Sequence, residues 1–247
     1  YTHYGCSVQA GGRDQWGNIT AGIDLIRRIK GGSAHGLTFP LLTTASGVKI
    51  GKTEGAEGTD MIWLDAELTS PYRMYQYWIN TDDRDVIKFL KLFTFLDLSS
   101  IAELEGSLKK NPEQREAQKV LAFEFTKLAH GEDAARAARE ASEILFGGQV
   151  QRISPEVLAA LLKEVPTTKI SKERLRPGIP LVDILIETKI AKSKRAARDL
   201  VSQGGAYVNN QAWREGEAKI SLEHCLSGKA ILLRSGKKNY HLLIIEE

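Results

Sequence analysis

The sequence has few cysteines and no long apolar segment. Its 247 residues include only two cysteines, Cys6 and Cys225, which form no Cys-x-x-Cys pair, so neither a disulfide-stabilised scaffold nor a structural zinc site is expected. No apolar run approaches the roughly 20 residues of a transmembrane helix, and the first residues show no signal-peptide pattern, so we expect a cytoplasmic protein. The net charge of +3 is too small to indicate a partner by itself, and binding to nucleic acid must be judged from local clusters.

Residues 48–53, Val-Lys-Ile-Gly-Lys-Thr, carry the most informative chemistry. Lysine is a compact charge on a flexible stem, and glycine loosens the backbone. A loop with two lysines, Lys49 and Lys52, therefore suits a polyphosphate whose charge shifts during a reaction, although a solvated turn explains these residues equally well. A P-loop is excluded because it needs four residues between its glycines, whereas Gly47 and Gly51 enclose three.

The sequence around this loop favours the polyphosphate interpretation. Residues 9–19 read Gln-Ala-Gly-Gly-Arg-Asp-Gln-Trp-Gly-Asn-Ile, and apolar residues at helical spacing follow. Further distinctive blocks cover residues 39–42, 52–54, 62–65, 69–72, 75–80, 93–96 and 236–240. Together with the lysine loop, these blocks closely resemble the bacterial-type tyrosyl-tRNA synthetases over essentially the whole chain. In that family the loop is a variant of the second class I signature, Lys-x-x-Lys-Ser/Thr.

The resemblance implies three domains. The first is α/β, the C-terminal part of a Rossmann-like class I synthetase catalytic domain, and it is followed by an all-α domain and a small α+β S4-like RNA-binding domain. The expected boundaries are 1–45 for the nucleotide-binding part, 46–68 for the lysine loop and connector, 69–165 for the helical anticodon-binding domain, 166–179 for a linker and 180–247 for the S4-like domain.

Local patterns agree with this division. A strand over 8–10, a glycine turn and a helix form the usual layout at the edge of a doubly wound nucleotide site. Further helices are expected from Ser70-Pro71, from Asp82 or Asp83, over 113–130, over 132–146, from Leu181 and, capped by Ser193, over 194–203. Alternating strands are expected at 229–234 and 240–245, with a shorter strand at 206–208 before a turn at Asn209-Asn210. Residues 166–180 give only a weak and basic pattern, which indicates a linker.

Two parts of the family pattern are missing. The first class I signature, a His-x-Gly-His-like element, is absent, because the five histidines lie far apart in the sequence. The family's tyrosine-binding helix, which contacts the amino group and the phenol of the substrate, is absent as well. We therefore expect the chain to be the C-terminal part of a longer protein, with half of an active site and little or no activity in isolation.

The resemblance assigns the nucleotide and tyrosine site to the two early blocks. The expected catalytic residues are Lys49, Lys52 and Thr53, which hold the pyrophosphate. The expected ATP contacts are Lys52, Gly12, Asp14, Leu41 and Leu42, and the expected tyrosine contacts are Gln9 and Gln15. ATP enters as its Mg²⁺ complex, and no tightly bound metal is expected. Judged without the family, Asp14 is a helix N-cap, the glutamines are surface residues and the leucines belong to the core.

Two basic clusters near the C-terminus are the candidate RNA contacts. The first contains Lys192, Lys194, Arg195 and Arg198 at a helix start, and the second contains Arg234, Lys237 and Lys238 at a hairpin that also carries Tyr240. Cations bind phosphates, and unpaired bases stack on aromatic rings. Judged by its charge alone, the first cluster is an ordinary basic surface exposed to solvent. As part of an S4-like unit, it is expected to bind the variable arm and anticodon stem of the tyrosine tRNA.

The resemblance implies a tyrosine–tRNA ligase, which activates tyrosine with ATP to tyrosyl-adenylate and transfers it to the 3′ end of tyrosine tRNA. The expected partners are ATP, L-tyrosine and tyrosine tRNA, and the full-length protein is expected to be a homodimer. The lysine loop, with Gly12 and Asp14, favours the enzyme. The missing first signature favours the alternative, a tRNA- or RNA-binding fragment without catalytic activity. A third hypothesis is the stabilisation of RNA structure, as in some mitochondrial members of the family.

Overall fold

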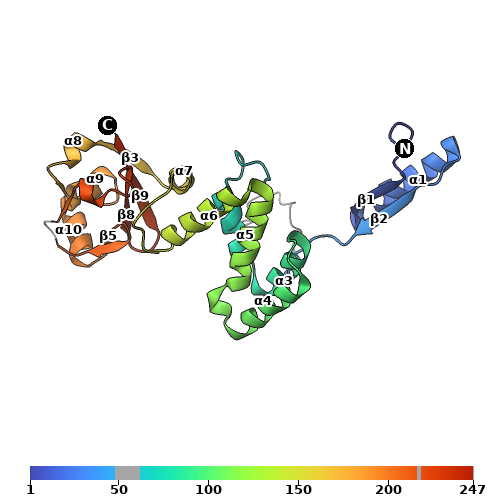
Figure 1. Cartoon of the computed structure of the whole chain (residues 1–247), viewed down its shortest axis with the longest axis horizontal. Coiled ribbons are helices and arrows are strands. Elements are labelled where there is room, and N and C mark those ends of the chain that lie inside the picture. The colour runs from blue at the N-terminus through green and yellow to red at the C-terminus, as the bar shows by residue number, and fades with distance from the viewer. Residues whose placement is uncertain (48–61, 216–217, 247) are drawn as a thin grey trace. The chain divides into compact units, whose positions relative to one another are not determined.

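The computed structural model describes residues 1–47, 62–215 and 218–246. It divides into two compact units, Tyr1–Met61 and Ile62–Glu247, which are drawn as ribbons in Figure 1. No helix within the described ranges is both long and apolar enough to cross a lipid bilayer.

The first unit is a strand–helix–strand motif. Its elements are strand β1 (Val8–Gly12), the 3₁₀ helix η1 (Arg13–Gln15), helix α1 (Trp16–Lys30) and strand β2 (His35–Phe39). The strands are parallel, in register from Val8 opposite His35 to Gly12 opposite Phe39. Parallel strands need a crossover connection, and α1 supplies it. The expected strand and helix are confirmed, and the strand extends two residues further than expected.

Only one side chain of α1 is buried. Ile19 is 1% exposed and lies against β2, where a Cβ at Gly36 would come within 2.5 Å of Ile19 Cγ2. Leu25 and Ile29, which belong to the same apolar pattern, are 58% and 66% exposed. The reason is that two strands offer too little surface to cover the apolar stripe of a 15-residue helix.

The second unit begins with six helices. They are α2 (Pro71–Ile79), α3 (Asp83–Phe93), α4 (Leu98–Lys110), α5 (Glu116–His130), α6 (Glu132–Leu145) and α7 (Pro155–Glu164), with the 3₁₀ helix η2 (Pro112–Gln114) before α5. Ser70 accepts a hydrogen bond from the backbone of Arg73, with Pro71 in the first helical position. Asp82, rather than Asp83, caps α3. The sequence signals for these two helix starts are therefore confirmed.

The rest of the second unit is built on a five-stranded sheet. Its strands are β3 (Thr167–Ser171), β5 (Ala206–Val208), β6 (Gln211–Trp213), β8 (Ala230–Ser235) and β9 (Asn239–Glu246), in the order β3-β9-β8-β5-β6. Helices α8 (Lys172–Leu175), α9 (Leu181–Glu187) and α10 (Lys194–Ser202), the 3₁₀ helix η3 (Leu222–His224) and the paired strands β4 (Ile179–Pro180) and β7 (Lys219–Ile220) complete it. Asn209 and Asn210 have φ values of 49° and 63°, as a two-residue type I′ turn requires.

Both faces of this sheet are covered by helices (Figure 1). Ile231 and Leu233 of β8 share a core with α9 and α10, whereas Leu232 shares a second core with α6 and α7. Neighbouring residues of a strand point to opposite faces, so a strand covered on both sides is apolar throughout. The strand expected at 229–234 is therefore confirmed as β8, but its expected alternation is wrong, because residues 230–233 are all buried.

Residues 166–179, which we expected to be a linker, contain β3 and α8. Strand β3 pairs in parallel with β9, from Thr167 opposite Leu242 to Ser171 opposite Glu246, and it is an edge strand of the sheet. Of its five residues only Ile170 is buried. An edge strand with a single buried side chain has no apolar alternation from which it could be recognised.

The helices and the sheet of the second unit share a core and a set of polar contacts. Leu242 of β9 packs in the same cluster as Ile144 of α6. The side-chain amide of Asn210 donates to the carbonyl oxygens of Ile144 and Gly148, at 2.7 and 2.8 Å. The Tyr240 hydroxyl donates to the Ile144 carbonyl at 3.4 Å. The β5–β6 and β8–β9 hairpins are therefore hydrogen-bonded to the C-terminal end of α6.

Candidate nucleotide site and basic surfaces

The carboxyl ends of β1 and β2 meet at one edge of the first unit, because Gly12 is paired with Phe39. At this edge a Cβ on Gly12 would lie 2.6 Å from Asp14 Oδ1 and 3.4 Å from Leu41 Cδ2. A Cβ at this position would therefore require the exposed Asp14 carboxylate to move. Ligands of open α/β sheets bind beyond the carboxyl ends of the strands. Three of the residues predicted to contact ATP thus lie together where such a ligand would bind.

Asp14 is not a helix cap. It is the middle residue of η1, whose N-cap is Gly12, and the N-cap of α1 is Gln15, which makes no side-chain capping bond. Asp14 is exposed, and within the described ranges its carboxylate has no hydrogen bond or ion pair. The alternative role as an N-cap is excluded, and the carboxylate is available to a ligand.

The two predicted tyrosine contacts lie on the α1 side of β1. Gln9 Oε1 is 3.6 Å from the position that a Cβ on Gly22 would take, and Gln15 Cβ is 3.3 Å from that of Gly11. Gln15 Oε1 also accepts a hydrogen bond from Asn18 Nδ2 at 3.0 Å. Leu42, the remaining predicted ATP contact in this unit, is half-buried. The predicted catalytic residues Lys49, Lys52 and Thr53 lie outside the described residues.

The first basic cluster lies at the N-terminal end of α10. Ser193 caps the helix by accepting a hydrogen bond from the backbone of Ala196, as the sequence predicts. The four cations of the cluster are all exposed: Lys192, Lys194, Arg195 and Arg198. Lys194 Nζ lies 3.6 Å from Asp183 Oδ1, an exposed pair that stabilises little. Cations in the first turn oppose the helix dipole, so helix stability does not account for their placement.

In the second basic cluster, Arg234 interacts with other residues of the chain, whereas Lys237 and Lys238 are exposed. The Arg234 guanidinium lies 3.6 Å above the centroid of the Tyr207 ring, and its Nη1 donates to Gly236 O at 2.8 Å. Lys237 and Lys238 lie in the β8–β9 turn and are exposed. Arg234 therefore stabilises the turn, and the two lysines are the cations that the turn presents to solvent.

Comparison with known proteins identifies the family of the chain. Residues 1–147 match the family described as tRNA synthetases class I (W and Y), and residues 157–243 match the tyrosine–tRNA ligase SYY-like C-terminal domain. The chain belongs to the tyrosyl-tRNA synthetase family. It is 46% identical to the tyrosine–tRNA ligase of Roseiflexus castenholzii and 49% identical to that of Geobacillus stearothermophilus, each over 244 residues. These alignments cover 98% of the chain but 57% and 56% of the two relatives, so the chain spans little more than half of their length.

A solved structure of the tyrosyl-tRNA synthetase family is also similar. It is a C-terminally truncated mitochondrial tyrosyl-tRNA synthetase from Aspergillus nidulans, with 32% sequence identity and a TM-score of 0.47. The likeness covers 57% of this chain and 41% of the solved one.

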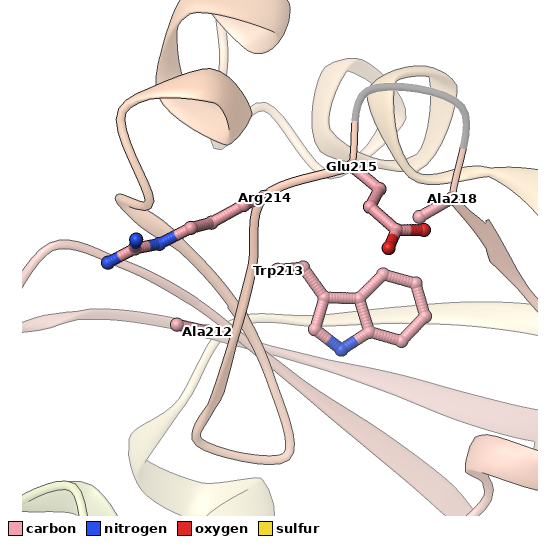
Figure 2. A pocket seen from close by; sticks show the side chains of 5 residues that line it. All are labelled: Ala212, Trp213, Arg214, Glu215 and Ala218. Atoms are coloured by element: carbon pink, nitrogen blue, oxygen red, sulfur yellow. The ribbon is translucent and has the colours of Figure 1, made fainter.

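Two cavities in the described part of the chain involve residues that the sequence did not single out. One, of about 390 Å³, is lined by the indole of Trp213 with Glu215 beside it, while Arg214 extends away from the ring (Figure 2). The other, of about 820 Å³, lies between α2, the ends of α6 and α7, and the β8–β9 turn. Its wall includes Phe146, which is 71% exposed. The sequence signal that could have drawn attention to Phe146 is its position directly before Gly147-Gly148, where the helix was expected to end.

Proposed function

We propose that this chain works as part of a tyrosine–tRNA ligase, which activates tyrosine with ATP to tyrosyl-adenylate and transfers the tyrosyl group to the 3′ end of tyrosine tRNA. The family match over residues 1–147 carries the proposal. It is supported by the grouping of Gly12, Asp14 and Leu41 at the ends of the parallel strands, and by relatives that bear the name tyrosine–tRNA ligase.

In the first step the carboxylate of tyrosine attacks the α-phosphate of ATP, and pyrophosphate leaves. Asp14 accepts hydrogen bonds from the ribose hydroxyls, since one carboxylate can accept several at once. Gly12 leaves room for the nucleotide, and Leu41 and Leu42 contact the adenine. Gln9 and Gln15 contact the tyrosine.

The lysine loop acts on the other end of ATP. Lys49 and Lys52 stabilise the charge that develops on the pyrophosphate, and Thr53 hydrogen-bonds beside them. Mg²⁺ accompanies ATP as part of the substrate complex. Positioning and charge stabilisation of this kind supply most of the catalysis in phosphoryl-group chemistry.

The C-terminal domain, 180–247, is in this proposal an S4-like RNA-binding domain. Lys192, Lys194, Arg195 and Arg198 form one phosphate-binding surface, and Lys237 and Lys238 form a second one that Arg234 supports. The helical domain, 69–165, binds the anticodon side of the tyrosine tRNA. The full-length ligase is a homodimer.

Tyrosine-dependent ATP–pyrophosphate exchange tests the enzymatic proposal. The chain is assayed alone and as a fusion behind the part of the Geobacillus stearothermophilus ligase that it does not match. We expect exchange from the fusion and little or none from the chain alone. An Asp14→Ala fusion should lose exchange. An Asp24→Ala fusion, altered at a half-buried carboxylate that pairs with Arg27 and Arg28 on α1, should retain it.

A fusion that folds and binds tyrosine tRNA but gives no exchange would contradict the ligase. That result would favour the alternative, an RNA-binding fragment without catalytic activity. The basic surfaces on α10 and the β8–β9 turn are the observation that supports this second candidate.

A further inference from the structure

The cavity of about 390 Å³ at β6 combines an indole, a carboxylate and two methyl groups. Its lining consists of Ala212, Trp213, Arg214, Glu215 and Ala218, and its volume lies within the range of about 300–1,000 Å³ typical of ligand sites. We propose that this cavity binds an alkylammonium group, with the cation between the Trp213 ring and the Glu215 carboxylate. The proposal is independent of the ligase function, because it uses none of the residues assigned to ATP, tyrosine or tRNA.

The Trp213 indole is held in place by the fold. Trp213 is half-buried and is the last residue of β6, where it pairs with Ala206 of β5. Part of its side chain packs against the core that the sheet shares with α9 and α10. Its ring meets that of His224 edge-on, with 4.9 Å between the ring centroids and 71° between the planes. A side chain fixed in this way loses little conformational freedom when a ligand contacts its remaining surface.

The charge of the cavity favours a cation. The Glu215 side chain extends toward the indole, whereas Arg214 extends away from it (Figure 2). Arg214 lies against Gly204 instead, where a Cβ would come within 3.0 Å of Arg214 Nε. Glu215 is exposed, and within the described ranges its carboxylate has no hydrogen bond or ion pair. The acidic group of the lining is therefore available to a ligand, and the guanidinium is directed elsewhere.

An indole beside a carboxylate is suited to an organic cation. The face of a tryptophan ring attracts ammonium groups more strongly than the faces of tyrosine and phenylalanine do, and a carboxylate adds a charge-assisted hydrogen bond. Ala212 and Ala218 contribute methyl groups, which suit a carbon chain. An alkylammonium ion joins such a chain to a cation, either in a free polyamine or in a lysine side chain. A nucleotide fits less well, because Glu215 repels its phosphate.

Two-dimensional proton–nitrogen NMR spectra of the full chain, titrated with butylammonium, test the inference. The indole N–H signal of Trp213 is identified by its absence from the Trp213→Leu variant. Butylammonium should shift this signal until it saturates and leave the other indole signals in place. Butanol has the same carbon chain without the charge, so at equal concentration it should cause a shift at least about fivefold smaller.

Two substitutions of glutamate separate a specific contact from general attraction. Glu215→Gln removes the charge but keeps the shape of the side chain, so it should weaken butylammonium binding about three- to fivefold without altering the unfolding midpoint. Glu223→Gln is the matched control, because Glu223 is exposed on η3 and does not line the cavity. This control should bind like the wild type. Trp213→Phe, followed through the backbone signal of Ala218, should weaken binding about twofold.

Two further ligands distinguish the sources of the ammonium group. Spermidine represents a free polyamine, and a lysine residue capped at both ends represents a side chain of a partner protein. Tighter binding of spermidine than of the capped lysine would assign the cavity to a polyamine, and the reverse order would assign it to a protein. Both results require the contact with Trp213 and Glu215.

Four outcomes would overturn the inference. The first two are no saturable shift of the Trp213 signal and equal shifts with butylammonium and butanol. The third is equal weakening in Glu215→Gln and Glu223→Gln, which would show that the cation is attracted to the domain as a whole. The fourth is a larger shift with uridine monophosphate than with butylammonium. Each of these results leaves the ligase function untouched, because pyrophosphate exchange tests it separately.

Discussion

Asn210 links the β5–β6 hairpin to the C-terminal end of α6 by hydrogen bonds. Its replacement measures how much this contact between the helices and the sheet contributes to the free energy of unfolding. Its amide donates to the carbonyls of Ile144 and Gly148, and its φ of 63° is left-handed. Two hydrogen bonds contribute about 1–3 kcal/mol net, and a left-handed alanine costs about 1 kcal/mol more. Asn210→Ala should therefore lower the free energy of unfolding of the second unit by about 2–4 kcal/mol. Asn210→Gly should lower it by about 1–3 kcal/mol, because glycine accepts this conformation.

Urea unfolding followed by both circular dichroism and tryptophan fluorescence measures this loss. The two signals should shift to lower urea together, because the helices and the sheet share one core. Asn239→Ala is the control: Asn239 is exposed and makes neither contact to α6, so it should change the free energy of unfolding by less than about 0.5 kcal/mol. An Asn210→Ala chain as stable as this control would refute the reasoning, as would a helical signal that does not shift at all.

Three further changes test single contacts. Gly12→Ala places a Cβ 2.6 Å from Asp14 Oδ1, so it should reduce pyrophosphate exchange of the fused ligase about 10- to 100-fold; unchanged exchange would contradict the proposed ribose contact. Ser193→Ala removes the cap of α10 and should cost about 1 kcal/mol in urea unfolding, whereas Ser193→Thr should restore most of it. Burial lowers the pKa of His241 below its usual 6.5, so the folded state holds the neutral imidazole, and stability that is complete above that pH is lost as the pH falls. His241→Gln, which can still bond to Thr168 Oγ1, should flatten this loss in a pH series of unfolding midpoints, and an equal acid loss in both proteins would contradict the assignment.

Signals that are local in the chain predicted the structure well. Ser70, Asp82 and Ser193 cap helices because a side-chain oxygen next to a free backbone N–H acts over a few residues. Asn209-Asn210 formed the expected turn because both residues tolerate positive φ. These features depend on little beyond their immediate neighbours in sequence.

Features that depend on distant partners could not be predicted. Strand β3 is stabilised by β9, far along the chain, and its own residues bury only Ile170. Arg234 was grouped with the RNA-binding cations, but its stacking on Tyr207 becomes apparent only when β5 and β8 pair. The cavity around Phe146 likewise joins segments that the sequence separates widely.

The resemblance named Gly12, Asp14 and Leu41 together, and the structure brings these three residues close to one another. Their role as ATP contacts stays a prediction. The exclusion of Asp14 as a helix cap required the 3₁₀ turn before α1, which no sequence pattern indicated.

The position of β9 between β3 and β8 determines the order in which the second unit can be completed on the ribosome. Thr167 pairs with Leu242, a separation of 242 − 167 = 75 residues. At about 5–20 residues per second of synthesis, β3 must wait roughly 4–15 seconds for β9. The apolar sides of α6 and α7 wait longer, because these helices come earlier in the chain. The earlier helices can form from local contacts meanwhile, whereas the sheet, with its long-range pairing, forms last and slowly. A nascent chain halted within that interval exposes Leu161 and its neighbours, which makes this interval the period of greatest need for a chaperone.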